Sequence, residues 1–194
     1  MPAGLLLAAG AGRRMGQPKA LVELAGEPLV RRSLRVLADG GCAPLLVVLG
    51  ATAAAVRAVL PAGVHAVIAP HWAEGMGASL RAGLAAFEEL EPEPDAAVVH
   101  LVDLPGVTGS AVARLVGAGA GTDVLLRAAY AGRPAHPVLI GRSHWVGVRA
   151  AAIGDAGVRT YLADHPALRL VDCADLADPD DVDTPEQLAA FRAR

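Results

Sequence analysis

The 194-residue chain carries 17 basic and 20 acidic residues, for a formal net charge of −3, and hydrophobic residues make up 54% of it. This balance gives no general reason to expect nucleic acid or an anionic membrane as a partner, and the apolar stretches are too short to span a bilayer. Cys42 and Cys173 form no metal-spaced pair and do not suggest a disulfide scaffold, so we expect a cytoplasmic protein with one domain over residues 1–194.

Apolar runs and helical patterns alternate along the first half of the chain. The sequence predicts buried strands at 5–7, 45–49, 64–69 and 96–102, because each is a continuous apolar run. Helices are predicted from Pro28 to Gly40, over 53–60, and from near Ser79 to about Leu90. This alternation indicates an α/β fold of the three-layer, Rossmann-like kind, with a mostly parallel sheet and helices on both faces.

The second half is less regular. A helix is predicted from Thr108 or Ser110 to Val116, a strand at 123–127, helices over 143–152 and 157–164, and a short strand at 168–171. Pro134 and Pro137 favour an extended segment at 133–140 near a sheet edge. The run Thr184-Pro185-Glu186-Gln187 predicts a capping box at the start of a last helix.

The first predicted strand leads into a glycine-rich basic loop. Glycines stand at positions 10, 12 and 16, with Arg13 and Arg14 between them and Lys19 after them. Glycines let a backbone approach a ligand closely, and free N–H groups, Arg and Lys bind anions, so the loop predicts a phosphate site. The dinucleotide fingerprint does not fit, since the third glycine comes one residue late, and the P-loop does not fit, since Lys19 lies between Pro18 and Ala20.

Three elements follow predicted parallel strands at their carboxyl ends, where ligands bind in such sheets: the 10–19 loop, the 70–79 loop and Asp103. Asp103 is followed by Leu-Pro-Gly, and such a carboxylate is either a ligand for Mg²⁺ or a cap for the turn. The acidic stretch at 178–183 supplies a second carboxylate or forms a solvated loop.

Residues 7–30, LAAGAGRRMGQPKALVELAGEPLV, resemble the signature of the nucleotidyltransferase superfamily that includes sugar-phosphate nucleotidyltransferases. They most resemble the MobA/MocA-like branch, which attaches a nucleotide to the molybdenum cofactor. The match comprises Leu7 to Gly10, Arg14-Met15-Gly16 and Lys19. Asp103-Leu104-Pro105 matches the family's metal-binding aspartate, and the Asp-Val-Asp-Thr-Pro-Glu run from Asp181 matches its C-terminal motif. The resemblance implies the nucleotide-diphospho-sugar transferase type of fold.

The resemblance also implies a reaction, the transfer of CMP from CTP to the phosphate of molybdopterin or the molybdenum cofactor, with release of pyrophosphate. Arg14, Lys19 and Asp103 would be catalytic. Mg²⁺, or Mn²⁺ in its place, would be held by Asp103 together with Asp183 or Asp181, of which we favour Asp183. The nucleotide would contact Leu7, Ala8, Ala9, Gly10, Ala11, Gly12, Arg14, Lys19, Gly75, Gly77 and Ser79. CTP is favoured because guanylyl-transferring relatives more often have Leu-Ala-Gly-Gly where this chain has Leu-Ala-Ala-Gly.

Two segments resemble acceptor-side sequences of the cytidylyltransferase branch, with Ala135 and Val158 as departures from the usual pattern. They imply acceptor contacts from His136, Pro137, Asp155 and Arg159, and a product that is handed to a molybdoenzyme or its chaperone. Other readings stay open. They are a guanylyltransferase, a sugar- or polyol-phosphate nucleotidyltransferase, an NAD(P)H-dependent oxidoreductase acting on an aromatic pigment, as in a similar branch, and a non-catalytic cofactor carrier.

Overall fold

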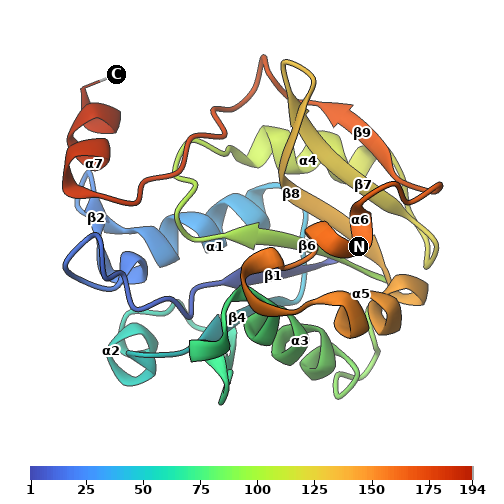
Figure 1. Cartoon of the computed structure of the whole chain (residues 1–194), viewed down its shortest axis with the longest axis horizontal. Helices are drawn as coiled ribbons and strands as arrows, with labels where there is room; N and C mark the ends of the chain where they lie inside the picture. The colour runs from blue at the N-terminus through green and yellow to red at the C-terminus, as the bar shows by residue number, and fades with distance from the viewer. Residues whose placement is uncertain (194) are drawn as a thin grey trace.

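The computed structural model describes residues 1–193, and a seven-stranded sheet forms the centre of this part of the chain (Figure 1). The strand order is β5 (His65–Ile68), β4 (Leu45–Leu49), β1 (Ala3–Leu7), β6 (Ala96–Leu101), β8 (Arg133–Gly141), β7 (Leu125–Tyr130) and β9 (Arg169–Asp172). Neighbouring strands are parallel except where β8 pairs with β6 and β7. The predicted class, a mostly parallel α/β sheet, is confirmed.

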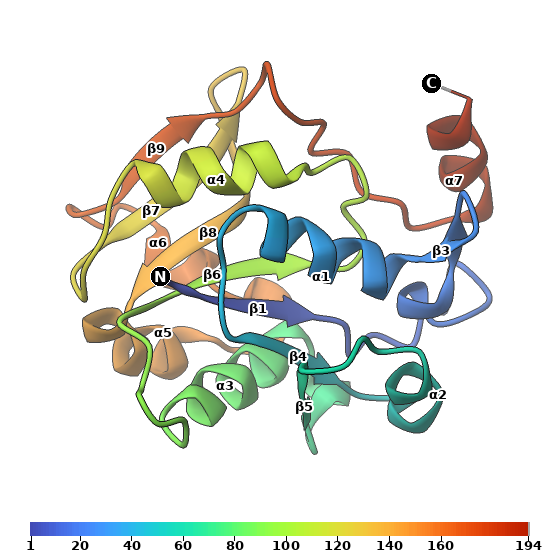
Figure 2. The same ribbon diagram turned by 180° about the vertical axis from the view of Figure 1, so that it is seen from behind.

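Helices cover both faces of the sheet. Figure 2 shows α1 (Leu29–Asp39) and α4 (Gly109–Gly117) in front of one face. The other face carries α3 (Met76–Phe87), α5 (Trp145–Ala151) and α6 (Arg159–Leu162) (Figure 1). Successive strand residues point to opposite faces, so Leu6 and Val98 pack on the first side while Leu5 and Val99 pack on the second. The strands are buried on both sides, which explains their uninterrupted apolar sequences.

Smaller elements complete the fold. The short helix α2 (Ala53–Ala58) follows β4, and the hairpin of β2 (Glu23–Leu24) and β3 (Glu27–Pro28) follows the glycine-rich loop. The last helix, α7 (Pro185–Arg192), lies beside this hairpin in both views, and Arg192 donates to the carbonyl of Glu23 at 2.6 Å (Figures 1 and 2). The C-terminal segment is thereby brought next to the N-terminal loop. Within residues 1–193, no helix is long and apolar enough to cross a membrane.

The prediction that residues 133–140 lie near a sheet edge is wrong, because β8 lies between β6 and β7. Both prolines fall where the ladder is irregular. Pairing with β6 begins only at Val138, and the register with β7 shifts between Arg127 and Ala129. Side chains supply hydrogen bonds there instead: Arg127 donates to the carbonyl of Ala135 at 3.1 Å, and Tyr130 donates to that of His136 at 3.0 Å. An internal strand therefore tolerates two prolines.

Two helix starts follow the predicted capping patterns. Thr108, rather than Ser110, caps α4 by accepting a hydrogen bond from the N–H of Ala111 at 3.2 Å. The capping box of α7 is confirmed, since Thr184 accepts from the N–H of Gln187 while the Gln187 side chain accepts from the N–H of Thr184. This cap fixes the end of the loop that carries Asp183.

Candidate active site

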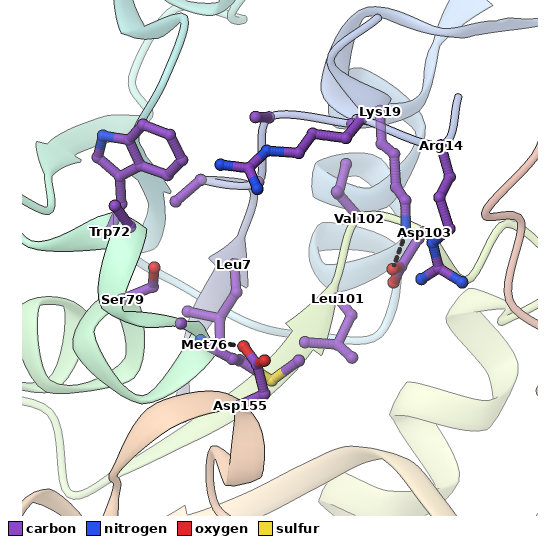
Figure 3. Close-up of a pocket in the computed structure, with 17 residues that line it drawn as sticks. Leu7, Arg14, Lys19, Trp72, Met76, Ser79, Leu101, Val102, Asp103 and Asp155 are labelled. Carbon is purple, nitrogen blue, oxygen red and sulfur yellow. Dashed lines mark hydrogen bonds and ion pairs between the residues drawn. The ribbon is translucent and has the colours of Figure 1, made fainter. Parts of the chain in front are cut away.

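A cavity of about 550 Å³ lies beyond the carboxyl ends of β1 and β6 (Figure 3). The three elements predicted to meet at this edge do so: the glycine-rich loop, the segment before α3, and the end of β6. A fourth element, the 3-10 turn η4 (Gly154–Ala156), contributes Asp155. The lining residues are Leu7, Ala9, Gly10, Ala11, Gly12, Arg13, Arg14, Lys19, Trp72, Ala73, Gly75, Met76, Ser79, Leu101, Val102, Asp103 and Asp155.

The glycine-rich loop folds back on itself before Lys19. Gly12 has a φ of +64°, and a Cβ there would lie 1.9 Å from the carbonyl oxygen of Gln17, so this position requires glycine. A Cβ on Gly10 would meet nothing within 4 Å, which leaves the backbone open to the cavity. The loop therefore presents main-chain groups and the side chains of Arg13, Arg14 and Lys19 to one space.

Lys19, the one lysine in the 194 residues, joins two carboxylates that are far apart in the sequence. Its Nζ lies 2.7 Å from Oδ2 of Asp103 and also contacts Oδ1 of Asp183. Arg14 approaches the other oxygen of Asp183 at 2.6 Å. The main chain holds the two acidic segments together, since the N–H of Val182 donates to the carbonyl of Asp103 at 2.9 Å. Figure 3 shows Lys19 and Arg14 both directed toward Asp103.

The electrostatic interactions within this group favour the charged forms of Lys19 and Asp183. Burial lowers the pKa of Lys19, but the charge of Asp103 and hydrogen bonds to both carboxylates outweigh burial and raise the pKa above its ordinary value. For Asp183, burial acts to raise the pKa, but the hydrogen bond and charge of Lys19, with those of Arg14, bring the pKa below the usual range. Two carboxylates and two cations thus balance in charge at neutral pH.

The carboxylate pair fits a divalent metal that binds oxygen. Asp103 and Asp183 each direct an oxygen at the same ammonium group, so their oxygens flank one point. Mg²⁺ and Mn²⁺ are commonly held by one or two carboxylates together with substrate phosphates. No group of three or more His, Cys, Asp or Glu suited to a metal occurs in the described part of the chain, so phosphate oxygens would complete the ligand set. The structure brings Asp183 to this point, while Asp181 is exposed.

On the opposite wall of the cavity, the start of α3 packs closely against the turn η4. The N–H of Met76, the first residue of α3, donates to Oδ1 of Asp155 at 3.4 Å (Figure 3). A Cβ on Gly75 would lie 2.6 Å from the same oxygen, and a Cβ on Gly77 would lie 2.6 Å from the carbonyl of Ala152. The glycines therefore allow close packing of the two segments, and Asp155 caps a helix whose own N-cap residue is glycine.

Several predicted contact residues lie outside the lining of this cavity. Ala8 and Gly77 are buried, Ala8 in the core on the α1 side and Gly77 against Ala152. Pro137 is buried within the sheet, and the side chains of His136 and Arg159 bond to main-chain carbonyls beside the cavity. By contrast, Trp72, Met76 and Leu101 line the cavity but were not predicted as contacts. The available signal was that Leu101 ends β6, while Trp72 and Met76 lie in the segment that connects β5 to α3.

Comparison with known proteins identifies the family. Residues 4–170 match the MobA-like NTP transferase domain. The chain belongs to this family. The predicted family is thereby confirmed, and all residues that line the cavity lie within the matched range, while Asp183, which contacts Lys19 and Arg14 of the lining, comes after it.

Three proteins similar to this MobA-like domain bear on its chemistry. It is 37% identical over 195 residues to the nicotine blue oxidoreductase of Paenarthrobacter nicotinovorans, covering 95% of this chain and 93% of that protein. It is 48% identical over 46 residues to a probable molybdenum cofactor guanylyltransferase of Opitutus terrae, covering 24% of this chain and 23% of that protein. The crystal structure of Rv0371c from Mycobacterium tuberculosis H37Rv in complex with manganese is 29% identical, with a TM-score of 0.77, and the match covers 98% of this chain and 97% of that one.

Proposed function

We propose that this MobA-like domain, acting as one unit over residues 1–194, transfers CMP from CTP to the phosphate of a molybdopterin-type acceptor and releases pyrophosphate. The observation that carries the proposal is the cluster of Lys19 and Arg14 around Asp103 and Asp183, directly beside the glycine-rich loop. This combination suits a triphosphate, because it offers a glycine-rich main chain and two cations in one cavity, with a carboxylate pair in contact with those cations.

The reaction follows from these positions. An oxygen of the acceptor phosphate attacks the α-phosphorus of the triphosphate, a new P–O bond forms, and the bond to the bridging oxygen breaks so that pyrophosphate leaves with the electron pair. The attacking phosphate is already anionic near neutral pH, so the chain needs no general base. Arg14 and Lys19 bind the triphosphate and stabilise the charge that develops on pyrophosphate. Mg²⁺ or Mn²⁺ bound at Asp103 and Asp183 would supply additional neutralisation of phosphate charge.

The base would lie between the start of the loop and the start of α3. Ala9 and Gly10 are on one side and Ser79 is on the other, and Trp72 adds an aromatic surface on which a ring can stack. The Leu-Ala-Ala-Gly sequence favours CTP over GTP by analogy with relatives. We place the reaction in the cytoplasm, upstream of handover to a molybdoenzyme or its chaperone, as parts of the same proposal.

The test is pyrophosphate release with Mg²⁺, molybdenum cofactor as acceptor, and CTP, GTP, ATP and UTP in parallel, with Asp103→Asn beside the wild type. Release with CTP alone, abolished in the variant, is expected. Release with GTP alone would keep the mechanism and overturn the assignment of the base. No release and no nucleotide binding would contradict the transferase.

A second candidate rests on the 37% identity to nicotine blue oxidoreductase over 95% of the chain. In that case the cavity would hold an aromatic pigment, which accepts a hydride from NAD(P)H, and Trp72 would contact the pigment ring. One assay distinguishes the nucleotidyltransferase from the oxidoreductase. Oxidation of NAD(P)H that depends on the pigment, without pyrophosphate release from any triphosphate, would favour the oxidoreductase.

A further inference from the structure

Among the residues that line the cavity, all within the described range, Trp72 is the one aromatic side chain. It begins the 3-10 turn η2 (Trp72–Glu74), which lies between β5 and α3. A Cβ on Gly50, directly after β4, would lie 2.7 Å from Cγ of Trp72, so the indole packs against main chain. The turn η2 itself has no buried residue, so its position depends on contacts at the surface.

Glu74, at the end of η2, makes such contacts through both of its carboxylate oxygens. Its Oε1 lies 3.3 Å from Nδ1 of His71, the residue before Trp72. Its Oε2 accepts a hydrogen bond at 3.2 Å from Nη2 of Arg81 on α3. His71 and Glu74 therefore flank the tryptophan on one turn, and Arg81 connects that turn to α3.

Arg81 also holds the second segment of this wall. Its other terminal nitrogen donates to the carbonyl of Ala152, which lies at the end of α5 and two residues before η4. Gly77, one helical turn before Arg81, faces the same carbonyl, since a Cβ there would lie 2.6 Å from it. Asp155 of η4 lines the cavity. A single guanidinium thus joins the segment that carries Trp72 to the segment that carries Asp155.

The contacts of Arg81 act on this wall more than on global stability. The side chain of Arg81 is 35% exposed and that of Glu74 is 58% exposed, and an ion pair at such positions contributes little to the free energy of unfolding because water screens it. For η2, which has no buried residue, the same ion pair is a substantial part of what holds the turn. Loss of Arg81 would free η2 while the core stays packed.

We propose that Arg81 is the positioning residue of a surface that binds a planar heteroaromatic ring between Trp72 and Asp155. In Figure 3, Ser79 and Met76 are seen between these two side chains. The inference rests on the proposed function, in which the ring is the nucleotide base. A fixed aromatic surface binds a ring better than a mobile one, because less freedom is lost on binding. The phosphates bind at the glycine-rich loop, so Arg81 affects the ring and not the phosphates.

The first test needs no ligand. The chain has two tryptophans, and Trp145 is only 1% exposed, so quenching of fluorescence by acrylamide reports mainly on Trp72. Arg81→Met is expected to raise the Stern–Volmer constant about twofold, because η2 loses its attachment to α3. Arg149→Met is the matched control, since Arg149 on α5 pairs with Glu88 at the other end of α3, at 2.9 Å. An unchanged constant in Arg81→Met would overturn the proposal.

A double variant tests whether Arg81 acts through Glu74. Glu74→Gln is expected to raise the quenching constant in the same direction, and the double variant should not exceed Arg81→Met alone, because both changes remove one contact. Additive increases would contradict the coupling. Each variant should keep a Tm within about 4 °C of the wild type, which separates a local effect from loss of the fold. If Arg81→Met does not fold, Glu74→Gln at its exposed position decides the question.

The second test separates the ring from the phosphates. In calorimetry without divalent metal, Arg81→Met is expected to weaken the binding of CTP about tenfold, while the binding of inorganic tripolyphosphate stays within about twofold of the wild type. Equal weakening of both would contradict a role at the ring. If the wild type binds tripolyphosphate but none of the four nucleoside triphosphates, the proposed transferase fails, and the quenching result alone decides whether Arg81 positions Trp72.

Discussion

The Nζ atom of Lys19 lies 2.7 Å from Oδ2 of Asp103, at the centre of the candidate site. The same ammonium contacts Asp183, so the lysine occupies the space between the two carboxylates that fit a divalent metal. Lys19 is thus the counter-cation of this carboxylate pair. If a metal ion binds the pair as proposed, it would compete with Lys19 for these oxygens until a triphosphate brings further negative charge.

Replacement of Lys19 by Met is therefore expected to strengthen the binding of Mn²⁺ alone, by about tenfold, because a competing positive charge is removed. The measurement is the free Mn²⁺ signal in electron paramagnetic resonance, without nucleotide. Arg35→Met serves as the control, since Arg35 forms a surface ion pair with Glu27 away from the cavity. Weaker Mn²⁺ binding in Lys19→Met would show that the lysine supports the carboxylates instead of competing for them.

The two neighbouring acids of the C-terminal segment should behave differently. Asp183 is buried against Lys19 and Arg14, while Asp181 is exposed. Asp183→Asn is expected to lower kcat for pyrophosphate release about 100-fold or more, because a charged group at the reacting phosphates is lost. Asp181→Asn is the matched control and is expected to stay within about twofold of the wild type. Equal losses in the two variants would argue against a specific role for Asp183.

His100 makes stability depend on pH. The imidazole is buried on β6, both of its nitrogens lack a hydrogen-bond partner within the described residues, and burial lowers its pKa from 6.5 to about 3. The unfolded chain therefore takes up a proton as pH falls below 6.5 while the folded chain does not. The contribution of the neutral imidazole to the free energy of unfolding is fully present above pH 6.5 and decreases progressively as the pH falls toward 3.

Urea unfolding should show a loss of about 2 kcal/mol between pH 7 and pH 5 from this residue. His100→Leu removes a buried group that has no partner, so we expect its stability at pH 7 to be retained and its pH dependence to be smaller by that amount. His65→Asn, at an exposed position on β5, should leave the pH dependence unchanged. An unaltered profile in His100→Leu would refute the assignment.

Gly77 should be needed for packing and not for nucleotide contact. A Cβ at this position would lie 2.6 Å from the carbonyl of Ala152, and main-chain atoms cannot move aside cheaply. Gly77→Ala is expected to destabilise the chain by about 1–3 kcal/mol, measured by thermal unfolding. Gly117→Ala is the control, because a Cβ there would meet nothing within 4 Å, and it should be neutral or slightly stabilising. A stable Gly77→Ala variant with impaired nucleotide binding would instead support the contact predicted from the family.

The parts of the fold predicted from sequence depend on local patterns. Continuous apolar runs indicated β1, β4 and β6, and the capping residues indicated the start of α7, because both signals lie within a few residues. The position of β8 was not predicted, since its prolines are compatible with an internal strand only through the bulge and the side chains of Arg127 and Tyr130. That compensation comes from another strand and leaves no local trace.

The candidate site was likewise predicted only in part from the sequence. Loops at the carboxyl ends of parallel strands were expected to converge, and they do. The orientation of residues within the loops was not predicted: Ala8 points into the core and Gly77 faces Ala152. Of the two C-terminal acids, Asp183, which the sequence analysis favoured, contacts Lys19.

The presence of one lysine in the 194 residues gives the site a selective chemical handle. Reductive methylation modifies only ε-amines and the α-amine, so a mass increase on the peptide that contains Lys19 reports directly on this cavity. The side chain is only 18% exposed and is held by two carboxylates, so labelling should be slow in the resting chain. The rate of Lys19 methylation then reports how often the lysine dissociates from its two carboxylates. A bound ligand that displaces or covers the lysine will change this rate without any turnover.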